Sequence, residues 1–282
     1  KVLNFLEFTH RKEIYTYKNK ILGYTIVVDF AGKGKITYPD GVIVNDETTS
    51  NLTKNENFVV LECVYRLLKL GYKPECIELE PKWEAPHDIG GGGKADVLVK
   101  DNAGESFLLI ECKTWGKEFD NYWKKTEQDG DQLFFYAVQK RSTKYLCMYA
   151  SNWDNDELVR KSNIISLKDN TATLESFDEP ISFEKANDKS SLFAAWNITY
   201  GKYSFKNGIF EDTCIPYLIE EKGRDISNIT EIGHDDIQKK YHEFTTILRQ
   251  HNVSGRENAF DKLVNLFLAK IVDEIRNSDK LQ

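Results

Sequence analysis

The sequence predicts an α/β fold of the α+β kind, with a mixed central sheet flanked by helices. Between residues 56 and 151, a helix, three strands, a second helix and a further strand are expected in turn. This order is typical of helices packed on a sheet. Short alternating apolar runs precede this region, and amphipathic stretches follow it. The 282 residues therefore divide into a β-rich extension, an α/β core, an irregular or β-containing connector and a helical region, at 1–55, 56–165, 166–232 and 233–282.

The core is expected to open with a helix. Thr53 and Glu56 have the T-x-x-E spacing of a capping box, and Gly71 is a natural stop. Between them, apolar residues recur at helical spacing. Further strands are expected at residues 76–80, 94–100, 106–115 and 144–151, and a helix at 131–140.

The two middle strands form a hairpin in this prediction. Asp-Asn-Ala-Gly at residues 101–104 is a good turn between two β-rich runs. Residues 116–130 are polar with interspersed aromatic side chains, and the pattern weakens after residue 160. Only short strands or irregular connections are expected there.

The composition limits the possible functions. Hydrophobic residues make up 40% of the chain and charged residues 29%, and no apolar run approaches the roughly 18 residues of a membrane span. The five scattered cysteines form no C-x-x-C pair, which favours the reducing cytoplasm over a disulfide framework. The net charge of −7 argues against a general DNA-coating protein, but it is compatible with an enzyme that holds a metal on acidic residues.

The glycine-rich stretch HDIGGGGKADVLV, residues 87–99, resembles a phosphate-binding loop only at first sight. Such a loop needs Ser or Thr after its lysine and a helix behind it. Here Ala95 follows Lys94, and a strand is expected next. The glycines are better interpreted as a flexible approach to the strand that carries Asp96.

Charged residues interrupt both strands of the expected hairpin. Because side chains alternate between faces, Asp96, Glu111 and Lys113 lie on the same face whether Asp96 pairs with Glu111 or with Leu109. Two carboxylates at close range repel each other, and a divalent cation relieves this cost. Mg²⁺ prefers oxygen ligands, which Asp96, Glu111 and the backbone carbonyl of Cys112 would supply. Lys113 would orient the attacking water or neutralise charge on a phosphate.

This D-x14-E-C-K pattern resembles the PD-(D/E)xK nuclease superfamily, with Ala95 where the family has proline. The resemblance covers residues 56–151 and implies a restriction-endonuclease-like fold with Mg²⁺-dependent cleavage of DNA, for which Mn²⁺ is a substitute. It also implies that Glu62, on the preceding helix, supports the site and is a further candidate metal ligand. A solvated or flanking carboxylate is the other interpretation of Glu62.

Gln132 and Tyr136 are four residues apart on one helical face. They resemble the Q-x-x-x-Y motif of exonuclease-type and type I restriction members of the superfamily. This implies that Gln132 supports the catalytic residues and that Tyr136 contacts the substrate, although Tyr136 also suits core packing. The surroundings resemble the N-terminal nuclease domain of type I restriction enzyme R subunits.

The C-terminal helical region offers a second resemblance. SGRENAFDKLVNLFLAKIVDE is similar to the N-terminal region of N6-adenine DNA methyltransferases of the type I modification kind. No [DNS]-PP-[YF] motif occurs in the chain, so the resemblance implies a piece of a fused restriction-modification protein in which a methyltransferase domain follows. The alternative is a helical packing or dimerisation element.

Contacts with double-stranded DNA are expected from Lys117, Lys124 and Lys125, which alternate with aromatic residues just after the second hairpin strand. Such charges position phosphates without reading bases, although a solvated surface has the same composition. The sequence thus predicts a Mg²⁺-dependent DNA endonuclease domain of a cytoplasmic restriction-modification protein, with methyltransferase and specificity domains or subunits as partners. A catalytically silent docking scaffold, or a nuclease of DNA repair or phage defence, remains the alternative.

Overall fold

A computed structural model describes residues 1–19, 23–82, 94–101 and 103–207, and in the C-terminal part residues 233, 238, 240–244, 262, 264–269 and 272. The glycines at 90–93 and His87 lie outside the described residues. The chain divides into two compact units, Lys1–Leu218 and Ile219–Gln282. In the second unit, residues 240–244 and 264–269 are helical.

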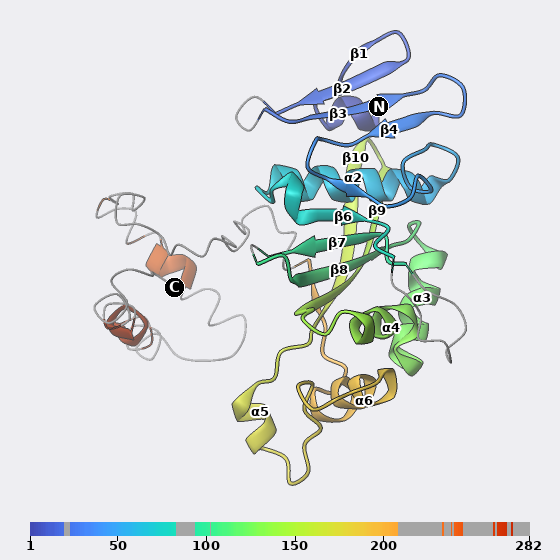
Figure 1. Ribbon diagram of the computed structural model, residues 1–282. Coiled ribbons are helices and arrows are strands. Elements are labelled where there is room, and N and C mark those ends of the chain that lie inside the picture. The colour runs from blue at the N-terminus through green and yellow to red at the C-terminus, as the bar shows by residue number, and fades with distance from the viewer. Residues whose placement is uncertain are drawn as a thin grey trace. The chain divides into compact units, whose positions relative to one another are not determined.

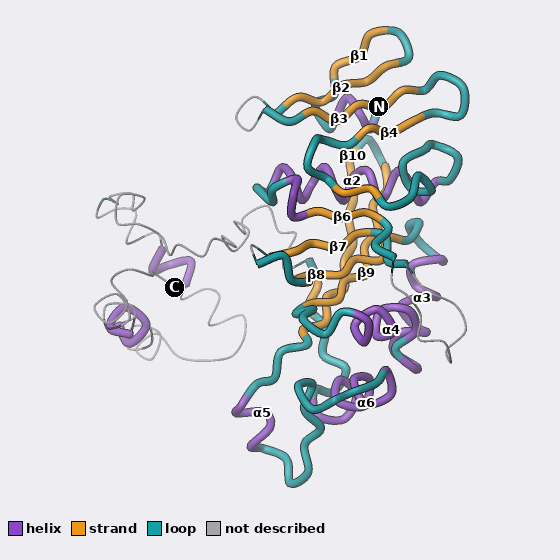
Figure 2. The backbone as a smooth tube through the Cα atoms, viewed as in Figure 1, coloured by secondary structure: helices purple, strands orange, loops and turns teal. Residues whose placement is uncertain are grey.

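The N-terminal part forms a small sheet of its own (Figure 2). After helix α1 (Val2–Phe5), four strands pair antiparallel in the order β1-β2-β3-β4. Their alternation leaves Ile26, Val28 and Ile36 fully or almost fully buried, as expected for a sheet with one covered face. The strand bounds are Thr9–Arg11, Ile14–Lys18, Thr25–Asp29 and Lys35–Thr37.

The main sheet has seven strands in the order β11-β10-β9-β8-β7-β6-β5 (Figure 1). The pairs β5–β6 and β8–β9 are parallel and the others antiparallel, so the sheet is mixed, as expected. Each parallel pair is joined by helices that cross over the sheet. The strand bounds are Ile43–Val44, Ile77–Leu79, Val97–Lys100, Ser106–Cys112, Tyr145–Asp154, Glu157–Ser166 and Phe205–Lys206, for β5 to β11 in turn.

Helices cover both faces of this sheet, which confirms the predicted α/β architecture. Helix α2 (Asn55–Lys69) packs on the face that carries Cys112 and Tyr149. Helices α3 (Lys117–Asp129) and α4 (Asp131–Gln139) pack on the opposite face, where Leu109 and Met148 join the same buried cluster as Tyr136 and Phe134. Residue parity along β8 therefore decides which helices a side chain meets.

The capping box predicted at the start of α2 is wrong. The N-cap residue is Lys54, without a side-chain cap. The backbone N–H of Thr53 donates to the side chain of Asn51 over 3.0 Å, and the Thr53 hydroxyl donates to the same oxygen. Because this local turn occupies the hydroxyl, Thr53 does not cap the helix.

Five further elements have no counterpart in the sequence prediction. Residues 116–130 contain helix α3, and residues 157–166 form the long strand β10. In the expected connector, helices α5 (Thr171–Glu175) and α6 (Lys189–Ala194) precede a wide helical turn at Ala195–Thr199. Trp196 of this turn is 1% exposed, so the connector contributes to the core.

Candidate metal centre

The β7–β8 hairpin brings Asp96 opposite Glu111. Val97 pairs with Ile110 and Leu98 with Leu109, and the next step of this register joins positions 96 and 111. The Asp96 side chain turns toward β8, where its Oδ2 accepts a hydrogen bond from the backbone N–H of Cys112 over 2.7 Å. The backbone carbonyl of Asp96 accepts from the N–H of Glu80 over 3.0 Å. The side chain of Asp96 is thus bonded to β8, and its backbone carbonyl to the residue that follows β6.

Lys113 connects two carboxylates at the end of β8. Its Nζ lies 2.7 Å from Glu111 Oε1 and 3.1 Å from Glu56 Oε1. Glu111 is 5% exposed and Lys113 6%, so both charges are almost completely removed from water. The backbone N–H of Lys113 donates to the carbonyl of Tyr149 over 2.9 Å, which fixes the position of the residue against β9.

These buried charges shift one another's pKa values. Burial raises the pKa of Asp96 to about 7, although Lys113 and the N–H of Cys112 oppose the shift. Burial and then the charge of Asp96 raise the pKa of Glu111 well above its ordinary range. Burial alone would lower the pKa of Lys113, but the carboxylates, with Glu111 first, outweigh it and raise that pKa. One ammonium thus faces three carboxyl groups, and a divalent cation would favour the ionised form of the two whose pKa is raised.

The residues present fit a hard divalent cation. Oε2 of Glu111 is buried without a hydrogen-bond partner in the described part of the chain, and carboxylate oxygens are ligands that Mg²⁺ prefers. No group of three or more His, Cys, Asp or Glu side chains placed to hold a metal occurs among the described residues. An ion on Asp96 and Glu111 would therefore need backbone oxygens or waters for its other ligands, and retained waters are usual for Mg²⁺.

Glu62 does not join this cluster, contrary to the prediction. Its carboxylate accepts from the hydroxyl of Tyr149 over 2.6 Å and from Nε of Arg160 over 2.7 Å. Tyr149 pairs with Cys112, whereas Glu111 pairs with Met148, so Glu62 lies against the opposite face of the sheet. Among the described residues, no hydrogen bond or ion pair joins Glu62 to Asp96, Glu111 or Lys113.

Glu56, which the sequence does not single out as a site residue, is the glutamate of α2 that contacts Lys113. Six residues along a helix turn the side-chain direction by about 120°, so the two glutamates of α2 point to different surroundings. Glu56 is in the first turn of α2, at the helix end that reaches Lys113. No pattern in the sequence marks Glu56 as a site residue, because its T-x-x-E spacing with Thr53 is typical of a helix cap.

Helix α4 carries the two motif residues, and Tyr136 lies close enough to the cluster to feel its charges. Tyr136 is 2% exposed, and its pKa is raised by burial and then by the charges of Glu111 and Asp96. Gln132 lies one turn earlier and is half-buried, and its Oε1 has no hydrogen-bond partner within the described chain. Tyr136 also belongs to the buried core cluster. Its ring therefore packs in the core while the residue lies near the carboxylates.

The three predicted DNA-contacting lysines lie on α3. Lys124 and Lys125 line a shallow surface cavity together with Tyr122. The Nζ of Lys125 lies 4.9 Å from the centre of the Tyr122 ring, and the Nζ of Lys113 lies 4.6 Å from it. The Tyr122 ring is therefore within cation–π distance of both the exposed ammonium of α3 and the buried one. Lys117 is the first residue of α3 and is exposed.

Lys94, the lysine after the four glycines, is held by protein groups. Its Nζ contacts Asp46 Oδ2 at 3.2 Å, Glu80 Oε1 at 3.3 Å and Thr48 Oγ1 at 2.7 Å. An ammonium surrounded by carboxylates is a poor phosphate ligand. The contacts agree with the sequence-based rejection of a nucleotide-binding loop.

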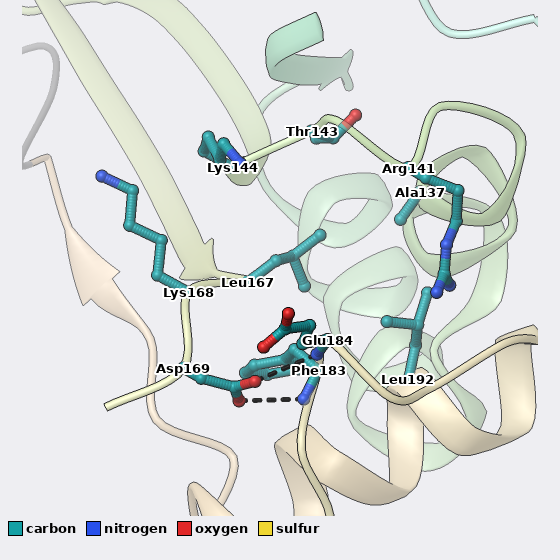
Figure 3. A pocket seen from close by; sticks show the side chains of 10 residues that line it. All are labelled: Ala137, Arg141, Thr143, Lys144, Leu167, Lys168, Asp169, Phe183, Glu184 and Leu192. Carbon is teal, nitrogen blue, oxygen red and sulfur yellow. Dashed lines mark hydrogen bonds between the residues drawn. The ribbon is translucent and has the colours of Figure 1, made fainter. Parts of the chain in front are cut away.

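A second group of cations lies at the other end of strands β8 and β9. Arg141, Lys144 and Lys168 line a cavity of about 490 Å³. Figure 3 shows these side chains together with the carboxylate of Asp169, which accepts a hydrogen bond from the backbone N–H of Phe183. Lys144 precedes β9 and donates its backbone N–H to Phe107, near the start of β8. Strand β8 has 7 residues, which span roughly 20 Å, so this cavity is well separated from Glu111 and Lys113.

No protein-family model matches the chain, and no curated protein has significant similarity to its sequence. The helices that the structure describes include none with the length and apolar character needed to cross a membrane. A functional conclusion therefore depends on the geometry of the acidic cluster and on the sequence motif that it contains.

Proposed function

We propose that this chain is a Mg²⁺-dependent endonuclease that hydrolyses phosphodiester bonds in double-stranded DNA. The observation that carries the proposal is the buried group of Asp96, Glu111 and Lys113, in which one oxygen of Glu111 lacks a partner among the described residues. Burying such charges is costly unless they bind something. The mixed sheet with helices on both faces suits the restriction-endonuclease-like fold that the PD-(D/E)xK resemblance implies.

In this proposal Asp96, Glu111 and the carbonyl of Cys112 hold the ion, and Glu56 keeps Lys113 in place. When bound, Mg²⁺ supplies a Lewis acid that favours ionisation of water and offsets phosphate charge. Lys113 stays protonated because its pKa is raised, so it acts as a cation and not as a base. Its ammonium would stabilise the negative charge that develops on the phosphate.

Hydrolysis then forms a bond between phosphorus and a water oxygen, and it breaks the bond between phosphorus and the leaving sugar oxygen, which takes up a proton. Tyr136, whose pKa the charges of Glu111 and Asp96 raise, and Gln132, one turn earlier on α4, would order these groups or contact the substrate. Lys124 and Lys125, with Lys117 at the start of α3, would bind backbone phosphates, an interaction that weakens with salt. A methyltransferase or specificity partner, and thus a restriction-modification role, is supported by the sequence resemblance.

The test is cleavage of plasmid DNA with Mg²⁺ or Mn²⁺ by the parent chain and by two lysine variants. We expect Lys113→Ala to lose at least about a hundredfold in cleavage rate, and Lys33→Ala, which changes an exposed lysine between β3 and β4, to stay within a few-fold. Equal cleavage by the Lys113 variant would show that another site is responsible. Mn²⁺ binding without any cleavage would favour a scaffold, and calorimetry with Asp96→Asn distinguishes this case from a chain that binds no metal.

A further inference from the structure

A second cavity opens next to the acidic cluster, on the face of the sheet that α2 covers. It has a volume of about 480 Å³, within the range of small-molecule pockets, roughly 300–1,000 Å³. Asn55, which precedes Glu56, and Thr114, which follows Lys113, both line it. The cavity and the cluster therefore share the end of β8 and the first turn of α2.

Three aromatic side chains line this cavity among aliphatic ones, and two of the three are exposed. Phe58 is 36% and Trp115 39% exposed, so ring surface is open at the cavity for a flat ligand to stack on. Trp153, from the end of β9, also lines the cavity, and its ring packs edge-on against Phe5 with the centroids 5.4 Å apart. These side chains come from α1, α2, β9 and the segment after β8, so a planar group placed here would meet ring faces or edges from several elements.

Polar groups at the same cavity suit the edge of a heterocycle. Asn55 and Asn152 are exposed lining residues, and neither carboxamide has a hydrogen-bond partner among the described residues. Each offers both donors and an acceptor. The carboxylate of Glu62 also borders the cavity, but it is bonded to Arg160 and Tyr149. Its charge is thus compensated, so it would not repel a DNA strand.

We propose that this cavity, the aromatic pocket, takes an unstacked nucleobase from the strand that is cut, next to the scissile phosphate. The inference rests on the proposed function, because the phosphate at Lys113 is what brings the strand to Trp115. A base has a flat face for the aromatic rings and polar edges for the two asparagines. It follows that DNA with an unpaired base binds better than a perfect duplex, in which the base must first leave the stack.

The experiment compares a duplex carrying one unpaired base with the matched perfect duplex. Binding is followed by fluorescence anisotropy in Ca²⁺, and cleavage is measured separately in Mg²⁺. We expect the parent chain to prefer the unpaired base, and Trp115→Ala to weaken that complex by about five- to a hundredfold, the range for a lost stacking contact. Trp115→Phe should keep the preference. Phe177→Ala, an equally exposed aromatic residue that does not line the pocket, should leave binding unchanged.

The outcomes separate the two proposals. Cleavage by the parent with no preference for an unpaired base, or a preference that Trp115→Ala retains, overturns the pocket and leaves the nuclease. Binding that depends on Trp115 without any cleavage overturns the nuclease and leaves the pocket. Absence of both binding and cleavage overturns both proposals.

Discussion

Lys113 and Glu56, 57 residues apart in the sequence, form an ion pair with an Nζ–Oε1 distance of 3.1 Å. Lys113 also binds Glu111 at 2.7 Å, so a single ammonium ties the first turn of α2 to the end of β8. The other glutamate of the helix, Glu62, is bonded to Tyr149 and Arg160 on the opposite face of the sheet. The two carboxylates of α2 therefore contact different groups, and substituting each of them should have a different effect on cleavage and on stability.

Glu56→Gln should lower Mg²⁺-dependent cleavage by about 10- to 100-fold, because a partner that orients the site is lost. Stability should change little, since the Glu56 side chain is 26% exposed. Glu62→Gln should cost about 1–3 kcal/mol of unfolding free energy, since a buried charge-assisted pair is weakened, and cleavage per folded molecule should persist. Thermal melting and cleavage rates check both variants. If Glu62→Gln lost cleavage and Glu56→Gln lost only stability, Glu62 and not Glu56 would belong to the site.

The pKa of Asp96 predicts how the stability of the metal-free protein depends on pH. This pKa rises from 3.8 to about 7 on folding, so the folded chain keeps the proton to higher pH than the unfolded chain does. The stabilising contribution is complete below about pH 4 and is lost as the pH rises through 7. Asp96→Asn cannot ionise there, so its melting temperature relative to the parent should increase from pH 4 to pH 7. Parallel melting curves across this range would contradict the shift.

Metal binding should be coupled to proton release. The carboxylates must ionise before they can hold an ion, and the pKa values of Asp96 and Glu111 are both raised. Mn²⁺ affinity should therefore fall as the pH decreases from 7.5 to 5.5. At 100 times its dissociation constant, the ion should stabilise the folded chain by about 2.7 kcal/mol. Calorimetry in buffers of different ionisation enthalpy counts the released protons, and Glu111→Gln should abolish the heat.

The strand residues of the candidate site could be predicted because their placement depends on local rules. Alternation puts Glu111 and Lys113 on one face of β8, and the short hairpin turn limits where Asp96 can pair. Only the register was open, and the pairing of Leu98 with Leu109 decides it. Such relationships extend over one hairpin, so no tertiary information is needed to find them.

The residues that were missed depend on how distant segments meet. Which side of α2 faces β8 is set by packing of the whole helix, and the spacing of Thr53 and Glu56 suggested a cap instead. Helix α3 was missed because only Phe119 and Thr126 of its 13 residues are buried, too few for an apolar period. In β10, Arg160 and Lys161 form ion pairs with Glu62 and Asp120, so charged residues interrupt the alternation typical of a strand.

Gln132 provides a test of whether an unsatisfied polar group is kept for function. Its Oε1 is buried without a hydrogen-bond partner among the described residues, and such a group costs stability. Gln132→Met has a similar volume and no amide, so it should raise the unfolding free energy by about 1 kcal/mol. It should at the same time lower Mg²⁺-dependent cleavage, the trade-off expected where a site is strained for its task. Gln128→Met, on the exposed surface of α3, should change neither. A Gln132 variant that is more stable and cleaves DNA at the parent rate would show that the carboxamide plays no part in the reaction.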